Sequence, residues 1–335
     1  MKSILGIGNA LTDILVELPD DTLLRQFHLP KGSMQHVDKE TGNKIWRVLK
    51  DMGAQYVAGG AAGNTITGTA VFGMPSGFIG KIGDDEIGAL YRSDQKRNGI
   101  RSTLLIGKED SGRASVFITP PNAERTFATY LGAAMELCPE DLKPEYFHGY
   151  DYFFIEGYLV QNQQLLRQAV KLAKEAGCRI AIDMASYNVV ESNDTFLHDI
   201  VEQYVDIVFA NETEAETFTR HSPREATDII AGMCSIAVVK IGAKGSFIKS
   251  GDEFHHIEAY PADVKDATGA GDLYAAGFLY AHASGMPLDV CGKVGSITAS
   301  KVVEVIGPKI DIPRWKSAKR EIRALIADNP QESVL

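Results

Sequence analysis

Apolar and polar positions follow two different patterns along this chain. From residue 152 onward, short apolar runs typical of buried strands alternate with amphipathic segments typical of helices. The strands are expected at Tyr152–Ile155, Arg179–Asp183, Asp206–Ala210 and Ile236–Ile241, and the helices at Gln163–Ala176, Asp194–Tyr204 and Pro223–Met233, with two more after Gly269 and Leu288. This alternation predicts a mainly parallel sheet with helices on both faces.

The N-terminal part of the chain is richer in short strands. Ile4–Gly8 is an apolar run that predicts a buried strand. Further short runs are separated by polar turns, and we expect them to form one small sheet that acts as a lid. These runs are Ile14–Glu17, Gly32–Val37, Leu104–Ile106, Ala114–Thr119 and Thr126–Tyr130. The alternative is that they only decorate the edge of the main sheet. The predicted domains are an α/β core of residues 1–13, 38–103 and 132–335, and a lid of residues 14–37 and 104–131.

Composition narrows the class of protein. The 335 residues include 34 Lys and Arg against 44 Asp and Glu, a net charge of −10 that argues against nucleic acid as a partner. The four cysteines are widely spaced, as expected of reduced thiols rather than of disulfides or a zinc site. No apolar run reaches membrane-spanning length, and the N-terminus does not resemble a signal peptide. We therefore expect a cytoplasmic protein without a membrane partner.

One heptapeptide, Asp266 to Asp272, carries the strongest chemical signal. It precedes an apolar segment that predicts a buried helix whose first turn contains Gly269, Ala270 and Gly271. A helix N-terminus with free N–H groups and two glycines is suited to binding a phosphate. Asp272 is better suited to act as a base, which takes the proton of a hydroxyl that attacks that phosphate. The alternative is a helix merely capped by Asp266 or Thr268.

Two more motifs lie near the N-terminus. Asn9 and Asp13 follow the first predicted strand, where side chains face the ligand site in α/β folds. Leu11 stands in place of the third glycine of a dinucleotide-binding motif. The sequence therefore disfavours that motif here, and it also disfavours a dinucleotide-dependent oxidoreductase. Gly59, Gly60 and Asn64 open a helix of small residues, where glycine permits close approach and Asn offers a donor and an acceptor to a polyol. A tightly packed helix is the alternative.

Two motifs follow later strands. Asn211 and Glu214 lie on one face of a helix start, where they could position a hydrated magnesium ion or simply cap the helix. Gly242 and Gly245 could form a turn against a purine and ribose, or a hairpin into Ser246–Lys249, and these are compatible. Lys240 and Lys244 could be merely solvated.

These motifs occur together, and the carboxyl ends of parallel strands meet at one edge of a sheet. The heptapeptide Asp-x-x-Gly-Ala-Gly-Asp also resembles the C-terminal signature of the ribokinase-like (PfkB) carbohydrate and nucleoside kinases, and the order of the motifs resembles that family over essentially the full chain. The resemblance implies a three-layer, doubly wound, mainly parallel sheet with a small β-sheet lid. It implies an enzyme that transfers phosphate from ATP to a primary alcohol with magnesium.

The resemblance also implies residue roles. Asp272 would be the base, and Gly269, Ala270 and Gly271 the anion hole. The acceptor would be held by Asn9, Asp13, Gly59, Gly60 and Asn64. ATP would be bordered by Asn211, Lys240, Gly242 and Gly245, with Glu214 positioning magnesium through water. Some members bind potassium beside the anion hole, and Asp266, Thr268 and Gly307 match those places.

Within the family, four segments resemble adenosine kinases, in particular the bacterial adenosine-kinase-like members. They are Gly8–Asp13, Lys31–Met34, Glu124–Phe127 and Leu131–Ala134. A purine needs an apolar slot, for which Phe127, Leu131 and Tyr158 are candidates. We expect a nucleoside kinase; a sugar kinase of the ribokinase, fructokinase or 2-keto-3-deoxygluconate type and a non-catalytic nucleoside or sugar sensor are the alternatives. The protein would be a monomer or a homodimer paired through the lid.

Overall fold

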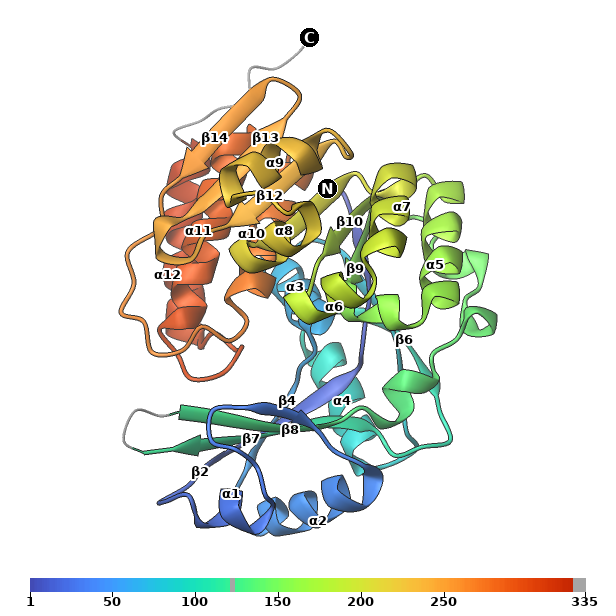
Figure 1. Ribbon diagram of the computed structural model, residues 1–335, viewed down its shortest axis with the longest axis vertical. Helices are drawn as coiled ribbons and strands as arrows, with labels where there is room; N and C mark the ends of the chain where they lie inside the picture. The colour runs from blue at the N-terminus through green and yellow to red at the C-terminus, as the bar shows by residue number, and fades with distance from the viewer. Residues whose placement is uncertain (121–123, 328–335) are drawn as a thin grey trace.

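The computed structural model describes residues 1–120 and 124–327, which form two sheets with helices around them (Figure 1). The large sheet has nine strands in the order β14 (Glu253–Ile257), β13 (Ser246–Ser250), β12 (Ile236–Lys240), β11 (Ile207–Asn211), β10 (Arg179–Asp183), β9 (Tyr152–Glu156), β1 (Ile4–Ile7), β5 (Ser76–Ile82) and β6 (Arg101–Ile106). Its strands pair in parallel except for β13 and β14, which add an antiparallel edge.

Helices cover both faces of the large sheet. The α-helices are α1 (Thr22–Gln26), α2 (Lys39–Lys50), α3 (Ala61–Val71), α4 (Glu86–Arg97), α5 (Gln163–Glu175), α6 (Tyr187–Ser192), α7 (Asp194–Tyr204), α8 (Glu212–Thr219), α9 (Pro223–Ala231), α10 (Ala270–Ala283), α11 (Leu288–Val303) and α12 (Ile312–Ala327). Short 3-10 helices are η1 (Gly132–Glu136), η2 (Pro139–Asp141), η3 (Pro144–Tyr146), η4 (Gly157–Gln161) and η5 (Gly242–Lys244).

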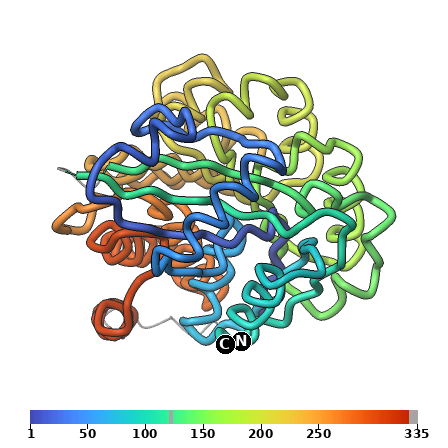
Figure 2. The backbone as a smooth tube through the Cα atoms, turned by 90° about the horizontal axis from the view of Figure 1, so that it is seen from below, coloured from blue at the N-terminus to red at the C-terminus, as the bar shows by residue number. Residues whose placement is uncertain are grey.

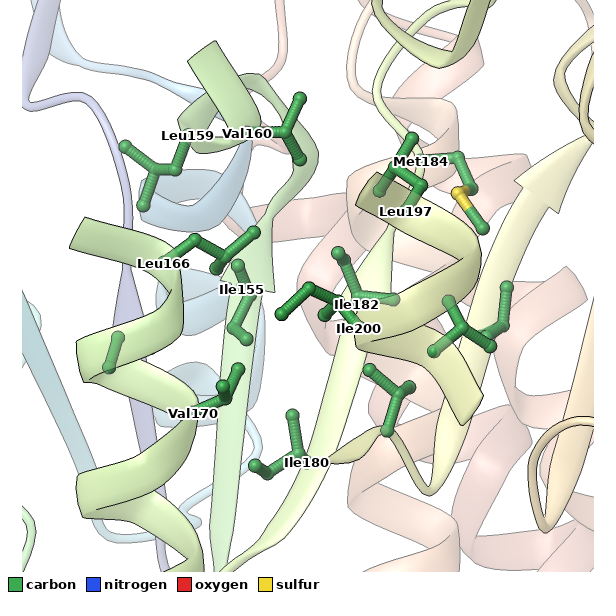
Figure 3. Close-up of a cluster of buried hydrophobic side chains, with 14 of the residues drawn as sticks. Ile155, Leu159, Val160, Leu166, Val170, Ile180, Ile182, Met184, Leu197 and Ile200 are labelled. Carbon is green, nitrogen blue, oxygen red and sulfur yellow. The ribbon is translucent and has the colours of Figure 1, made fainter. Parts of the chain in front are cut away.

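The period of two along each strand builds the layers. In β9, Phe153 and Ile155 pack into one apolar cluster with α5 to α9, whereas Tyr152 and Phe154 pack into a second cluster with α3, α10, α11 and α12. Figure 3 shows the first cluster, in which Leu166 of α5 lies with side chains of β9, β10 and α7. The predicted three-layer, mainly parallel α/β fold is confirmed.

The small sheet has five strands in the order β3 (Met34–His36), β8 (Glu124–Tyr130), β7 (Gly112–Thr119), β2 (Leu11–Glu17) and β4 (Gln55–Ala58). Helices α1 and α2 cover its outer face, where Ile14 and Phe117 pack into one cluster with Ile45 and Leu49 of α2. Its other face is turned toward the large sheet, and Figure 2 shows its blue and green strands lying across the core.

Two strands differ from the sequence prediction. The prediction that Leu104–Ile106 belongs to the lid was wrong, because β6 pairs in parallel with β5 and forms the edge of the large sheet. For this strand the alternative, a place at the edge of the main sheet, is correct. The reason is that α4 connects β5 to β6, and such a strand–helix–strand unit lays its strands parallel and side by side. Conversely, β4 was not predicted and pairs with β2 in the small sheet. The other domain bounds stay a prediction.

Among the described residues, no helix is long and apolar enough to cross a membrane.

Candidate active site

Polar side chains converge at the carboxyl edge of the large sheet. Glu156, Asp183, Asn211 and Lys240 are each the last residue of a parallel strand, and Asn9 lies two residues after β1. The N-termini of α3 and α10 reach the same place, because Asn64 of α3 contacts Asp272 of α10. Motifs predicted from separate parts of the sequence therefore form one site.

Asp272 lies at the centre of this site. Asn64 donates a hydrogen bond from Nδ2 to Asp272 Oδ2 at 2.9 Å, and Thr65 Oγ1 donates to the Asp272 carbonyl at 3.2 Å. Burial raises the pKa of Asp272 from an ordinary 3.8 to about 7; the Asn64 hydrogen bond opposes this rise and the charge of Asp183 adds to it. A carboxyl group with a pKa near neutrality is suited to general-base chemistry.

The predicted anion hole is the first turn of α10. Gly269 adopts φ of 76°, a left-handed conformation that suits glycine, and the helix begins at Ala270. Since the helix starts there, the N–H groups of Gly271 and Asp272 have no partner within it. All three residues of the predicted hole are half-buried rather than covered by packed side chains. The turn can therefore be reached by an anion.

Lys240 stands beside this turn. Its Nζ lies 2.7 Å from Asp183 Oδ2 and 3.0 Å from the position a Cβ of Gly271 would take. Burial alone would lower the pKa of Lys240, but the charges of Asp183 and Glu214 outweigh burial and the pKa is raised. The interpretation of Lys240 as merely solvated is wrong, whereas Lys244 is exposed. A fixed ammonium next to Gly271 adds positive charge to the anion site.

The acceptor side is formed by the β1–β2 segment and the start of α3. Asp13, expected in a loop, lies within β2, and a Cβ at Gly59 would collide with its carboxylate. A Cβ at Gly60, where φ is 80°, would collide with the carbonyl of Asn9, so both glycines are required for this approach. Burial raises the pKa of Asp13 to about 6, and nearby cationic side chains oppose that rise.

Glu156 connects the two segments of the acceptor side. Its Oε1 accepts from Asn9 Nδ2 at 2.7 Å, and its Oε2 accepts from the N–H of Ala62 at 3.0 Å. Asn64 contributes an open position, since its Oδ1 is buried without a hydrogen-bond partner among the described residues. A hydroxyl group that donates to this oxygen would satisfy it.

Asn211 and Glu214 form a reciprocal cap on α8. The Glu214 N–H donates to Asn211 Oδ1 at 2.9 Å, and the Asn211 N–H donates to Glu214 Oε2 at 2.8 Å, so the capping interpretation is confirmed. Burial and the charge of Asp183 raise the pKa of Glu214 to about 7, and Lys240 opposes this. The described residues contain no cluster of three metal-ligating side chains. Both Glu214 oxygens accept hydrogen bonds from Asn211, so a magnesium ion would reach this carboxylate only through its own water ligands.

The turn after β12 is a hairpin. Strand β12 pairs antiparallel with β13 through η5, which confirms the hairpin interpretation of this segment. Gly242 is exposed with φ of 58°, and an added Cβ would have open space around it. Gly245 has φ of 97°, and a Cβ there would collide with the carbonyl of Ile257. Only Gly242 therefore leaves room at the surface for a ligand.

The residues predicted to bind potassium do lie together. Asp266 Oδ1 accepts from the N–H and Oγ1 of Thr268, and Asp266 Oδ2 accepts from the N–H of Gly307 at 2.9 Å. Arg125 of the small sheet completes the set, with Nη1 at 2.6 Å from Asp266 Oδ2 and 3.0 Å from Thr268 Oγ1. Because protein donors occupy the lone pairs of this carboxylate, its side-chain oxygens do not fit a potassium ion in this arrangement.

Leu131 and Tyr158, both predicted to line a purine slot, lie in different parts of the site. Leu131 precedes η1, and its carbonyl borders Gly112 together with Leu11, which puts it beside the acceptor segment. Tyr158 of η4 is half-buried, and burial raises its pKa to about 12, an effect that Ser186 opposes. Its phenol lies near Ser186, on the β9–β10 side of the site.

Four charged residues were missing from the predicted site. Asp183 and Glu156 end or directly follow predicted strands, so strand-end position could have identified them. Arg125 lies in a segment already noted for its resemblance to the lid of adenosine kinases. Lys309, whose buried Nζ lacks a hydrogen-bond partner among the described residues, had no such signal. Its place depends on the packing of the loop between α11 and α12.

This chain is similar to known proteins over most of its length. The pfkB family of carbohydrate kinases matches residues 38–315. An adenosine kinase of Schizophyllum commune is 27% identical over 92% of this chain and 96% of its own, and a 5-dehydro-2-deoxygluconokinase of Bacillus subtilis is 29% identical over 81% and 88%. The crystal structure of adenosine kinase from Sinorhizobium meliloti superposes with a TM-score of 0.84 at 31% identity, covering 96% of this chain and 99% of that one.

The family match extends over most of the chain and includes the Asp266–Asp272 loop and the start of α3. The chain belongs to the pfkB family of carbohydrate kinases and is an ATP-dependent kinase.

Proposed function

We propose that the protein phosphorylates the 5′ hydroxyl of a nucleoside, with adenosine as the foremost acceptor. The observation that carries this proposal is the hydrogen bond between Asn64 on the acceptor side and Asp272 at the anion turn. It supports a site in which an acceptor alcohol and the transferred phosphoryl group meet at one carboxylate. The similarity to adenosine kinases supports the choice of nucleoside.

The inner face of the small sheet supports a flat acceptor. The strand registers place Leu15 of β2 beside Val116 of β7, and Val116 beside Phe127 of β8. Side chains of paired residues share a face, and Asp13, two residues from Leu15, shares it too. An apolar row next to a carboxylate suits a purine joined to a ribose.

In the proposed reaction, Asp13 and Asn64 hold the acceptor so that its primary hydroxyl faces Asp272. Asp272 accepts the hydroxyl proton as the oxygen attacks phosphorus. The N–H groups of Gly271 and Asp272 and the ammonium of Lys240 stabilise the charge on the transferred group. Glu214 would hold a magnesium ion through water, which would further neutralise phosphate charge, and Asn211 and Gly242 border the nucleotide.

The small sheet of β2, β3, β4, β7 and β8, together with α1 and α2, acts as the lid. Arg125 joins it to the Asp266 loop, and Leu15 lies 3.1 Å from the position a Cβ of Gly307 would take. Closing this sheet over the acceptor excludes water and so suppresses ATP hydrolysis. A potassium ion could bind the Asp266 carboxylate only if Arg125 left it.

The protein acts as a monomer in the cytoplasm. A lid-mediated dimer needs a free outer face on the small sheet, and α1 and α2 cover that face. Elution at the monomer mass in size-exclusion chromatography with light scattering is expected, and a dimer would contradict this part of the proposal.

A sugar kinase is the second candidate, because relatives at similar identity are 5-dehydro-2-deoxygluconokinases. The deciding experiment measures ATP-dependent ADP release with adenosine, inosine, ribose, fructose, 2-keto-3-deoxygluconate and 5-dehydro-2-deoxygluconate. We expect the highest kcat/KM with adenosine. A higher kcat/KM with a sugar would replace the nucleoside by that sugar, and binding without ADP release would indicate a sensor.

A further inference from the structure

Lys309 occupies a fixed position beside the anion turn. It follows Gly307, whose N–H donates to Asp266, and Pro308, which lies 2.8 Å from the position a Cβ of Gly269 would take. The segment is thus packed directly against the N-terminus of α10. Lys309 is therefore part of the wall of the site rather than a mobile surface lysine.

The ammonium group of Lys309 is buried and lacks partners. Nζ is shielded from solvent and has no hydrogen-bond partner within the described residues. Three carboxylates attract it from a greater distance, in decreasing order Asp94 of α4, Asp13 of β2 and Asp272 of α10, while Arg97 of α4 opposes them. An ammonium has three N–H donors, and leaving them unsatisfied in a buried place is costly. A ligand that offers oxygen lone pairs would remove that cost.

We propose that Lys309 binds the phosphate acceptor and, together with Asp13, holds a pair of neighbouring hydroxyl groups, such as the 2′ and 3′ hydroxyls of a ribose. This inference rests on the proposed placement of the acceptor between Asp13 and Asp272. An alcohol can donate to a carboxylate and accept from an ammonium at the same time, so a diol satisfies both side chains.

The phosphoryl group is a less suitable partner for Lys309. The anion turn already has a lysine of its own, since Lys240 Nζ lies next to Gly271 and is fixed by Asp183. Gly307, two residues before Lys309, lies against Leu15 of β2, and Leu15 shares a face of that strand with Asp13, so this segment borders the acceptor side. Its contribution should therefore appear in the KM of the acceptor rather than in that of ATP.

The test combines a side-chain deletion with a hydroxyl deletion. Lys309→Met keeps the length of the side chain and removes the charge, Lys309→Arg keeps a cation but changes its shape and position, and Lys316→Met on the exposed face of α12 is the matched control. Kinetics are measured with adenosine, 2′-deoxyadenosine and 3′-deoxyadenosine, or with a sugar from the panel and its deoxy analogues if a sugar is the better acceptor. Lys309→Met should raise the KM of the full acceptor about 10- to 100-fold, as for hydrogen bonds to charged groups.

The decisive result is the coupling between the two deletions. With the deoxy acceptor that lacks the contacted hydroxyl, Lys309→Met and wild type should differ by less than about 3-fold. Equal losses with all acceptors, or a rise in the KM of ATP alone, would overturn the inference. Should Lys309→Met fail to fold, Lys309→Arg carries the test: it must change the ratio of kcat/KM between full and deoxy acceptors, whereas Lys316→Arg must not. Absence of kinase activity in the wild type would refute the proposed function instead.

Discussion

Replacing Asp272 by Asn tests two effects of this side chain, its contribution to catalysis and its effect on folding stability. Asparagine has nearly the same shape and still offers an oxygen to Asn64 Nδ2, which lies 2.9 Å from the carboxylate. It cannot accept the proton of an attacking hydroxyl. We therefore expect Asp272→Asn to lower kcat by roughly two to four orders of magnitude, with the KM of both substrates largely kept.

The same variant should be more stable at neutral pH. The pKa of Asp272 is about 7 in the folded state against 3.8 ordinarily, and this difference corresponds to about 4 kcal/mol. Between these two values the folded state binds the proton and the unfolded state does not, so stability falls as pH rises from 3.8 toward 7. At pH 8 the ionised carboxylate destabilises the wild type by up to about 4 kcal/mol. The uncharged amide of Asp272→Asn carries no such penalty.

The assay compares the wild type, Asp272→Asn and a control, Asp263→Asn. Asp263 is an exposed acid in the loop that precedes α10. Melting temperatures are measured from pH 5 to 8, together with ADP release at saturating substrates. We expect Asp272→Asn to melt about 3–6 °C higher at pH 8, with this gain shrinking toward pH 5. Wild-type turnover in Asp272→Asn would refute the base assignment. An equal melting temperature at every pH would refute the buried, proton-binding state of this carboxyl group.

The other predictions concern the acceptor, the lid and the metal. Asp13→Ala should raise the KM of the acceptor at least about 10-fold, with little change in the KM of ATP. In the wild type, acceptor binding should weaken as pH falls through about 6, because Asp13 then becomes protonated. An unchanged acceptor KM in Asp13→Ala would contradict the role of Asp13 in acceptor binding. Arg125→Met breaks the ion pair with Asp266, so hydrogen exchange in β7 and β8 should become faster and ATP hydrolysis without acceptor should rise. Exchange rates equal to those of the wild type would show that this ion pair does not hold the lid. Glu214→Gln should raise the magnesium concentration needed for half-maximal activity several-fold, and an unchanged magnesium titration would leave Glu214 only as the cap of α8.

Local patterns were enough to predict much of this fold and site. Strands β9 to β12 are short apolar runs between amphipathic helices, and each could be placed from its own residues. Once the strands are parallel, their carboxyl ends must meet, so Asn9 and Asn211 could be expected near Asp272 before any contact was known. The hydrogen bond from Asn64 to Asp272 joins residues 208 positions apart and agrees with that expectation.

What the sequence did not predict depends on distant partners. Leu104–Ile106 is apolar enough for either sheet, and only its pairing with β5 decides between them. Strand β4 has a polar residue at its start and is only partly buried, so it has no clear period of two. Lys240 could not be distinguished from a solvated lysine, because its partner Asp183 is 57 residues away.

The charge of the site argues for catalysis rather than simple binding. Burial raises the pKa of Asp13, Glu156, Glu214 and Asp272, so each carboxylate lowers stability when it is ionised. Glu156 compensates by bonding to two segments of the acceptor wall, and Glu214 by capping α8. Asp272 has no such compensation, because its hydrogen bond to Asn64 could be kept by an uncharged amide. A binding protein on this fold would gain stability from Asn at position 272 and lose no contact with its ligand. An acid whose pKa lies near 7 beside free N–H groups is suited to accept a proton, as is needed when an alcohol attacks a phosphoryl group.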